Sequence, residues 1–371
     1  MPEPAAGASA RSSGQVARWD TSRRGLIAIR RGGCKPRILP RSGPAILADR
    51  IRGGGRVIEP GRSAGAHWSD RPEGGGRFAL WLIRAIALRG GRGLARLILH
   101  PVTWYFYLRR AHEREASRAF LTRVWSRPAR PREVLRHLHA YAATTLDRVF
   151  LLTDRHRPFE VRIDGLDALR DRLDPRRGIL LLGAHVGSFE VLRALPHGRG
   201  DLDVRVVLDT RKTPAMTDLL HSLDPDLARR VIDASRPGPE LVFAMDRALR
   251  QGALVAVLGD RARPHEHTVA VDFLGAPARF PTAPFLVASL VKVPVVLCLG
   301  LYRGGARYDL SFEPFADTLT LTRERREEEL REVVQRYARR LEAVVREDPY
   351  NWFNFYDFWA DAAPAADTPR T

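Results

Sequence analysis

The stretch 178–195, GILLLGAHVGSFEVLRAL, constrains the fold more than any other part of the chain. Its apolar run 179–182, flanked by glycines, is typical of a strand buried on both faces of a sheet. The apolar residues then recur at helical spacing, with Ser188 where a helix N-cap is expected and Glu190 in the first turn. The sequence therefore predicts a buried strand that leads into a helix, with His185 at the carboxyl end of the strand.

His185 and Glu190 lie at the edge of the predicted sheet where open α/β proteins bind their ligands. An imidazole beside a carboxylate can take a proton from a hydroxyl group, while the carboxylate fixes its tautomer and stabilises the imidazolium ion. We therefore expect His185 and Glu190 to be catalytic. The alternative is a histidine with ordinary structural hydrogen bonds and a glutamate that only stabilises the helix terminus.

Strands and helices alternate along the chain after residue 130. The expected strands are 159–163, 178–183, 203–208, 253–259, 268–273, 294–301 and 308–312, and the expected helices are 131–152, 214–223, 239–250, 284–291 and 325–348. Such alternation predicts an α/β fold with a mixed, largely parallel central sheet flanked by helices. Because no helical signal separates 253–259 from 268–273, we expect the antiparallel part of the sheet there.

The positive charge of the chain is concentrated at its N-terminus. The net charge is +18, and residues 1–66 hold 13 Arg and Lys against 4 Asp and Glu. This segment is rich in Gly, Arg, Pro and Ser and has no apolar period, which predicts a disordered basic extension. A tail that binds nucleic acid or anionic lipid and an over-extended gene start explain it equally well. No nucleic-acid-binding motif accompanies the charge, so nucleic acid is not an expected partner.

Two apolar, aromatic helices are expected within residues 67–125. Segments 78–88 and 94–108 are interrupted by arginines and a proline, and neither reaches the roughly 20 uninterrupted apolar residues of a spanning helix. We expect both to lie in the membrane interface, with arginines directed to lipid phosphates. Core helices and a kinked or re-entrant hairpin are the alternatives. The residues expected at headgroup level are Trp81, Trp104, Tyr105 and Tyr107.

Charged residues follow two further strands at the same predicted edge of the sheet. Arg211 follows one apolar strand, and Asp260 and Arg261 follow the next. A guanidinium group binds a phosphate or sugar oxygen through its planar fork, so we expect these residues to bind substrate. An ion pair at a strand end is the alternative for Asp260 and Arg261. Arg279 is a weaker candidate of the same kind.

The sequence gives no support for metal, nucleotide or disulfide chemistry. Cys34 and Cys298 make no disulfide framework and fit a reducing cytoplasmic setting. The HEH run at 265–267 follows a proline in a polar loop, where solvation is expected rather than metal binding. The glycine-rich segments 53–55 and 74–76 lack the lysine and hydroxyl of a phosphate-binding loop. We therefore expect no cofactor.

A series of short blocks resembles the bacterial lipid A late acyltransferase branch of the lysophospholipid acyltransferase superfamily. The first block, GAHVGSFE at 183–190, is similar to the G-x-H-x-G-x-x-E run that carries the catalytic histidine and acidic residue of that branch. The later blocks are LDTR at 208–211, GDR at 259–261, VDFLGA at 271–276 with RFP at 279–281, and YNWFNFYDFW at 350–359. The last blocks most resemble a subgroup associated with aryl-polyene or related glycolipid assembly.

The resemblance, which spans residues 67–359, implies an O-acyltransferase at the cytoplasmic face of the inner membrane. The donor implied is a fatty acyl thioester of acyl carrier protein, with coenzyme A thioesters as the alternative, and the acceptor is a hydroxyl group of a lipid or glycolipid. His185 would be the general base and Glu190 would orient it. The competing functions are a hydrolase with the same dyad and a non-catalytic basic membrane-surface or nucleic-acid-binding protein. The expected regions are a disordered extension 1–66, membrane-associating helices 67–125, an acyltransferase domain 126–360 and a disordered tail 361–371.

Overall fold

The computed structural model describes residues 15–17, 76–153, 159–174, 176–194, 202–211, 214–263 and 266–360, which all belong to one compact unit. The predicted basic extension, apart from strand β1 (Gln15–Ala17), and the predicted tail 361–371 lie outside the described residues. Side chains are described from residue 89 onward, so the expectation for Trp81 also lies outside.

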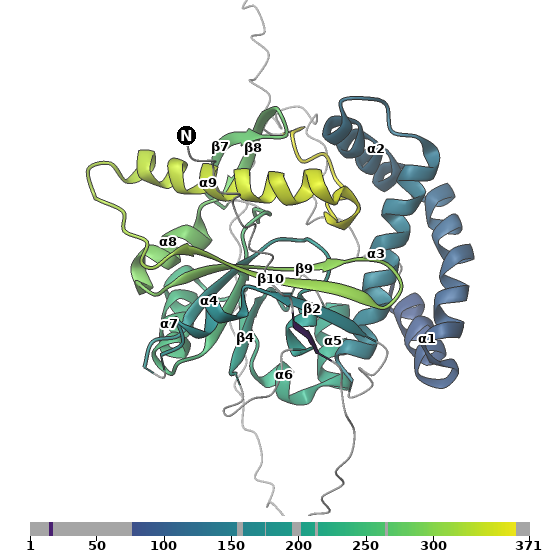
Figure 1. Cartoon of the computed structure of the whole chain (residues 1–371), viewed down its shortest axis with the longest axis horizontal. Helices are drawn as coiled ribbons and strands as arrows, with labels where there is room; N and C mark the ends of the chain where they lie inside the picture. The colour runs from purple at the N-terminus through teal and green to yellow at the C-terminus, as the bar shows by residue number, and fades with distance from the viewer. Residues whose placement is uncertain are drawn as a thin grey trace, which may run out of the picture. The chain divides into compact units, whose positions relative to one another are not determined.

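An eight-stranded sheet forms the centre of the described structure, in the order β1-β2-β10-β9-β3-β6-β4-β5 (Figure 1). Neighbouring strands are parallel except at the β1/β2 and β9/β10 pairs. This confirms the predicted α/β fold with a mixed, largely parallel sheet. The strands are β2 (Glu160–Asp164), β3 (Ile179–Gly183), β4 (Val204–Leu208), β5 (Ile232–Asp233), β6 (Leu254–Leu258), β9 (Val295–Tyr302) and β10 (Arg307–Ala316).

The unbroken apolar run of β3 is explained by its central place in the sheet. It lies between β6 and β9 and is parallel to both. Leu180 and Leu182 belong to one hydrophobic cluster, and Ile179 and Leu181 belong to a second. All four side chains are buried to within 1% of complete burial, which confirms the strand predicted here. Each face of β3 therefore contributes to a different core.

The antiparallel part of the main sheet lies elsewhere than predicted. β7 (Thr268–Phe273) leaves the central sheet and pairs with β8 (Ala276–Pro281) in a separate hairpin. Its turn residues Leu274 and Gly275 both have positive φ, as a tight hairpin turn requires. β8 contains two prolines, which a strand tolerates only at an edge, and these hid it from the sequence pattern. The antiparallel pair of the main sheet is β9 with β10.

Helices pack around the sheet at the positions that Figure 1 labels. The bounds of the five helices predicted at 131–152, 214–223, 239–250, 284–291 and 325–348 agree with the structure to within one residue. The short helices α4 and α6 were not foreseen. The helices are α1 (Gly76–Arg109), α2 (Ala111–Trp125), α3 (Pro131–Leu151), α4 (Leu166–Arg170), α5 (Pro214–Leu223), α6 (Pro225–Arg229), α7 (Gly238–Arg250), α8 (Ala283–Val291) and α9 (Arg326–Glu347).

The segment after β3 is a 3₁₀ helix, η2 (Phe189–Ala194), where an α-helix was expected. The backbone N–H of Val191 donates to the Ser188 carbonyl, an i→i+3 bond that gives this tighter winding. Ser188 does not act as the predicted N-cap, because its buried hydroxyl donates to the Glu190 carboxylate at 2.7 Å. The prediction of an N-capped α-helix was therefore wrong.

The two apolar segments expected near the N-terminus are the halves of one bent helix, α1. Gly91, with φ of 74° and ψ of 173°, interrupts the helical backbone between them, and Pro101 lies in the second half. None of the helices that the structure describes is both long and apolar enough to cross a membrane.

α1 is attached to α3 through a buried carboxylate. Arg92 donates two hydrogen bonds of 2.9 Å to Asp147, and Arg96 lies 3.5 Å from the same carboxylate. The Tyr308 hydroxyl donates a further bond at 2.9 Å. Arg96 therefore binds the protein rather than lipid phosphate, which corrects the expected role of this arginine. Tyr107, expected at headgroup level, packs against the larger hydrophobic cluster.

Replacement of Asp147 by alanine is expected to lower the free energy of unfolding by about 3–5 kcal/mol, because it leaves buried cationic and hydroxyl donors without their acceptor. Urea unfolding followed by circular dichroism would measure the loss. Asp317→Ala is a matched control, since Asp317 pairs with Arg172 while remaining 84% exposed. Equal stability of the two variants would show that Asp147 does not hold α1 in place.

Candidate active site

His185 lies in the turn that follows β3, as predicted. Its backbone N–H donates to both carboxylate oxygens of Asp260, at 3.0 and 3.1 Å, and its carbonyl accepts from the backbone N–H of Phe353 at 2.9 Å. The turn passes very close to β9: a Cβ at Gly187 would lie 1.9 Å from the Gly300 carbonyl oxygen, and Gly187 has φ of 59°. Only glycine fits this position. The imidazole, 31% exposed, is thus fixed at the sheet edge.

Asp260 follows β6, the strand beside β3, and its carboxylate holds the imidazole ring. Its Oδ1 lies 2.8 Å from Nδ1 of His185. The carboxylate is completely buried and also accepts from the Trp352 indole at 3.1 Å and from the Asn354 amide at 3.3 Å. Burial alone would raise the pKa of Asp260, but electrostatic interactions with His185 and Arg261 and the hydrogen bonds from His185 hold it at about 2. Asp260 is therefore ionised and accepts the Nδ1 proton, which leaves Nε2 with a free lone pair.

Two of the expected roles differ in the structure. Asp260 was expected to bind substrate, whereas its carboxylate in the structure is completely buried and accepts hydrogen bonds from protein donors. Glu190 was expected to orient the imidazole. Instead it accepts from Ser188 and lies 3.2 Å from Nε of Arg148 on α3. In the structure, Nδ1 of His185 therefore contacts Asp260, and Glu190 pairs with Arg148.

Two guanidinium groups act on the imidazole through their charge. Burial lowers the pKa of His185 from 6.5, the nearby Arg261 lowers it further, and Arg148 adds to the effect. Asp260 opposes this shift but does not outweigh it. The imidazole is consequently neutral at pH 7 and able to accept a proton.

The C-terminal aromatic segment 350–359 also contributes to the site. Trp352 is completely buried and, with Asn354, donates to Asp260. Arg261 donates in turn to the Asn354 side-chain oxygen and to the Phe353 carbonyl. Sequence reasoning missed Trp352 and Asn354 as site residues. Asn354 could have been recognised because its amide lies within a strongly aromatic run, and a buried amide needs polar partners.

Arg211 and Arg279 lie outside the hydrogen-bonded cluster around His185. Arg211 is exposed in the loop after β4, and β6 separates β4 from β3 in the sheet. Its side chain donates to the Ser235 carbonyl. Arg279, on β8, lies 3.4 Å from the Thr268 hydroxyl. The structure therefore brings His185, Asp260 and Arg261 together and places Arg211 after β4, which is next to β6 and two strands from β3 along the same edge.

The part of the chain that the structure describes contains no group of three or more His, Cys, Asp or Glu side chains that could hold a metal ion. Of the HEH run, His265 lies outside the described residues. Glu266 accepts from the backbone N–H of Arg263, and His267 lies 3.3 Å from the Thr282 hydroxyl.

Catalysis is expected to fall with decreasing pH through a pKa below 6.5, because only the neutral His185 imidazole can act as a base. Arg261→Gln removes a charge that lowers this pKa, so the acid limb should move to higher pH. The pH dependence of kcat/KM and the titration of the His185 ring by NMR would measure the shift, with Arg279→Gln as a control. If the pKa of His185 moves while the acid limb of the pH profile stays in place, the limb reports the titration of another group.

A neutral imidazole held by a buried carboxylate is typical of enzymes that activate a hydroxyl group. The family model of bacterial lipid A biosynthesis acyltransferases matches residues 78–360 of the 371-residue chain. The chain belongs to this family. It is an acyltransferase of the lipid A acyltransferase-like type, and its reaction is acyl transfer to a lipid in lipid biosynthesis.

The comparison with curated proteins gives no match. Among solved structures, the chain is similar to the 1-acyl-sn-glycerophosphate (LPA) acyltransferase PlsC from Thermotoga maritima. The two share 17% sequence identity over 67% of this chain and 96% of that chain, with a TM-score of 0.30.

Proposed function

We propose that the protein is an O-acyltransferase that moves a fatty acyl group from a thioester of acyl carrier protein to a hydroxyl group of a lipid or glycolipid. Nε2 of His185 takes the hydroxyl proton, the oxygen attacks the thioester carbonyl, and the C–S bond breaks. The imidazolium then returns the proton to the leaving thiolate. The observation that carries this proposal is the 2.8 Å contact between Nδ1 of His185 and the buried Asp260.

Asp260 is the residue that we propose to hold the imidazole in its catalytic tautomer. A carboxylate with a pKa of about 2 remains ionised while the ring gains and loses its proton, and so stabilises the imidazolium ion. The bond from the His185 backbone fixes the carboxylate relative to the ring. Asp260 thereby takes the role first expected for Glu190.

Glu190 is proposed to support catalysis through Arg148. Its carboxylate lies 3.2 Å from Arg148, whose charge lowers the pKa of His185. A positive charge near the base favours the negative charge that develops on the thioester oxygen in the transition state. The Ser188 hydroxyl holds the other carboxylate oxygen of Glu190 at 2.7 Å, which fixes the pair.

Arg261 and Arg211 are proposed to bind the polar or anionic head of the acceptor. Arg261 lies near enough to His185 to act on its pKa, so a group bound there is close to the base. Arg211 is exposed at the carboxyl end of β4, on the same edge of the sheet. The two arginines follow neighbouring strands, and we propose that they contact different oxygen atoms of one headgroup.

Membrane attachment at the cytoplasmic face of the inner membrane is proposed to involve α1. In its second half this helix exposes large apolar and aromatic side chains, each 49% to 67% accessible. Such a surface on a helix that does not span is typical of attachment within the membrane interface. The exposed residues are Leu94, Leu97, Trp104, Tyr105 and Leu108.

Replacement of Leu97, Trp104 and Leu108 together by serine is expected to weaken binding to anionic lipid vesicles about tenfold or more, because it removes the apolar surface from the interface. Vesicle co-sedimentation would measure this, and unchanged circular dichroism would show that the helix persists. Deletion of residues 1–66 should leave binding and activity in place. Loss of vesicle binding only in the deletion variant would assign attachment to the extension instead.

Lipid mass spectrometry of a deletion strain tests the proposed function. An envelope lipid should lose one acyl group in the deletion strain and regain it on expression of the wild-type protein, but not of His185→Ala. Identical lipid profiles in all strains would contradict acyl transfer to a lipid hydroxyl. Release of free fatty acid from the thioester, without an acylated product, would identify a hydrolase.

A further inference from the structure

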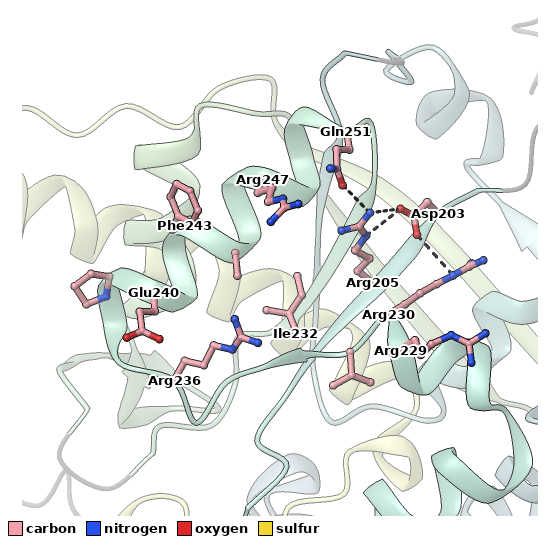
Figure 2. A pocket seen from close by; sticks show the side chains of 13 residues that line it. Asp203, Arg205, Arg229, Arg230, Ile232, Arg236, Glu240, Phe243, Arg247 and Gln251 are labelled. Atoms are coloured by element: carbon pink, nitrogen blue, oxygen red, sulfur yellow. Dashed lines mark hydrogen bonds and ion pairs between the residues drawn. The ribbon is translucent and has the colours of Figure 1, made fainter. Parts of the chain in front are cut away.

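A groove rich in arginine lies between α7 and the segments that flank β5 (Figure 2). It has a volume of about 910 Å³ and does not include His185. Five arginines line it, against two acidic residues, Asp203 and Glu240. The arginines come from β4, from α6 and the residue after it, from the loop after β5, and from α7: they are Arg205, Arg229, Arg230, Arg236 and Arg247.

The positive charge of this groove is only partly neutralised within the protein. Asp203 is shared, at 2.7 Å from Arg205 and 3.9 Å from Arg230. Among the described residues, no carboxylate lies within ion-pair distance of Arg236 or Arg247, and both side chains are exposed. The groove therefore keeps an excess of positive charge that is available to an anionic partner.

An exposed phenylalanine lies on the face of α7 that lines the groove. Phe243 is 70% exposed and lies between Glu240 and Arg247 on that face, whereas the opposite face carries buried residues such as Leu241 and Met245. Phe243 therefore has no role in the core. An exposed aromatic side chain flanked by arginines has the composition of a protein–protein contact, where aromatic residues and Arg are enriched.

One end of the groove lies at the edge of the sheet that carries His185. Arg236 follows β5, and carboxyl ends of parallel strands meet at one edge of a sheet. Arg263, two residues after Arg261, donates to the Ala234 carbonyl, and Arg211 donates to the Ser235 carbonyl. The backbone just before Arg236 is thus held by residues from the loops that border the active site.

We propose that this groove docks an acidic helix of the carrier protein that delivers the acyl thioester, with Phe243 against an apolar side chain of that helix. This inference rests on the proposed function, in which a carrier-bound thioester is the donor. A concave groove that runs along α7 fits a rod-like helix with carboxylates on one face, whereas a bilayer needs a flat or convex surface. The flexible arm of the carrier would then lead from the Arg236 end toward His185.

The test compares two charge-reversal variants that change the net charge equally. Arg236→Glu/Arg247→Glu alters the groove, and Arg331→Glu/Arg339→Glu alters the exposed face of α9. The probe is a purified bacterial acyl carrier protein that carries a fatty acyl thioester and a fluorescent label. We expect the groove variant to raise the Kd for this probe about tenfold or more, and the α9 variant to change it less than about twofold.

Two further measurements define the partner. The affinity for a fatty acyl coenzyme A should stay within about twofold in the groove variant, because that donor has no protein helix to dock. Phe243→Ala should raise the Kd for the carrier about fivefold without lowering the thermal unfolding temperature, because the side chain is exposed. Binding does not depend on the acceptor, so failure of this inference is distinct from failure of the acyl-transfer proposal.

Three outcomes would overturn the inference. Unchanged carrier affinity in the groove variant would show that the carrier docks elsewhere. Equal losses in the groove and α9 variants would show only a general effect of charge. Weakened binding to phosphatidylglycerol vesicles together with unchanged carrier affinity would assign the groove to a lipid surface.

Discussion

Replacement of His185 by alanine is expected to reduce kcat/KM for acyl transfer by about 10³-fold or more, because it removes the group that takes the proton from the acceptor hydroxyl. The geometry leaves no substitute, since the Asp260 carboxylate behind the ring is completely buried. Steady-state kinetics with a purified lipid acceptor and an acyl thioester would measure the loss.

The variant should remain folded. The His185 side chain is partly exposed at the sheet edge, and in its absence Asp260 still accepts from the His185 backbone N–H, from Trp352 and from Asn354. Thermal unfolding and near-ultraviolet circular dichroism would verify this. A well-folded variant with wild-type turnover would disprove the assignment of His185 as the base.

Asp260→Asn is expected to reduce kcat/KM by about 10³- to 10⁴-fold, because an amide cannot stabilise the imidazolium ion and can favour the wrong tautomer of the ring. Glu190→Gln should have the smaller effect, about ten- to a hundredfold, since Glu190 acts on the base only through Arg148. Side-by-side kinetics of the two variants decide which carboxylate orients His185.

The pH profile separates the two carboxylates further. Asp260 raises the pKa of His185, so its neutralisation should move the acid limb of the surviving activity to lower pH. The opposite order of effects, with Glu190→Gln close to inactive and Asp260→Asn close to wild type, would show that Glu190 contacts the imidazole during catalysis. Both substitutions keep the shape of the side chain, so a difference between them reports charge.

The Glu190–Arg148 pair also connects the active site to α3, and through Asp147 on the same helix to α1. Asp147 and Arg148 are consecutive, one facing the arginines of α1 and the other facing Glu190. A helix that holds both contacts positions the proposed membrane-binding helix relative to the catalytic turn. We therefore expect both vesicle binding and turnover to depend on α3.

Local patterns in the sequence determined the elements that make the site possible. The apolar run 179–182 requires a strand with both faces covered, and the structure buries it between two hydrophobic clusters. The apolar stripe at helical spacing in 325–348 is likewise buried in α9. His185 follows the buried strand, so its place at the sheet edge followed from period and composition alone.

The partners of those elements were decided only by the tertiary structure. Asp260 is 75 residues from His185 and reaches it because β6 pairs with β3 in register, while Trp352 and Asn354 arrive from the C-terminal segment. Glu190, five positions from His185, turns instead to Arg148. The period of the apolar residues indicates which face of a helix or strand is buried. It does not indicate which other helix or strand packs against that face. The hydrogen bonds of a buried carboxylate depend on that neighbour, and only the tertiary structure specifies it.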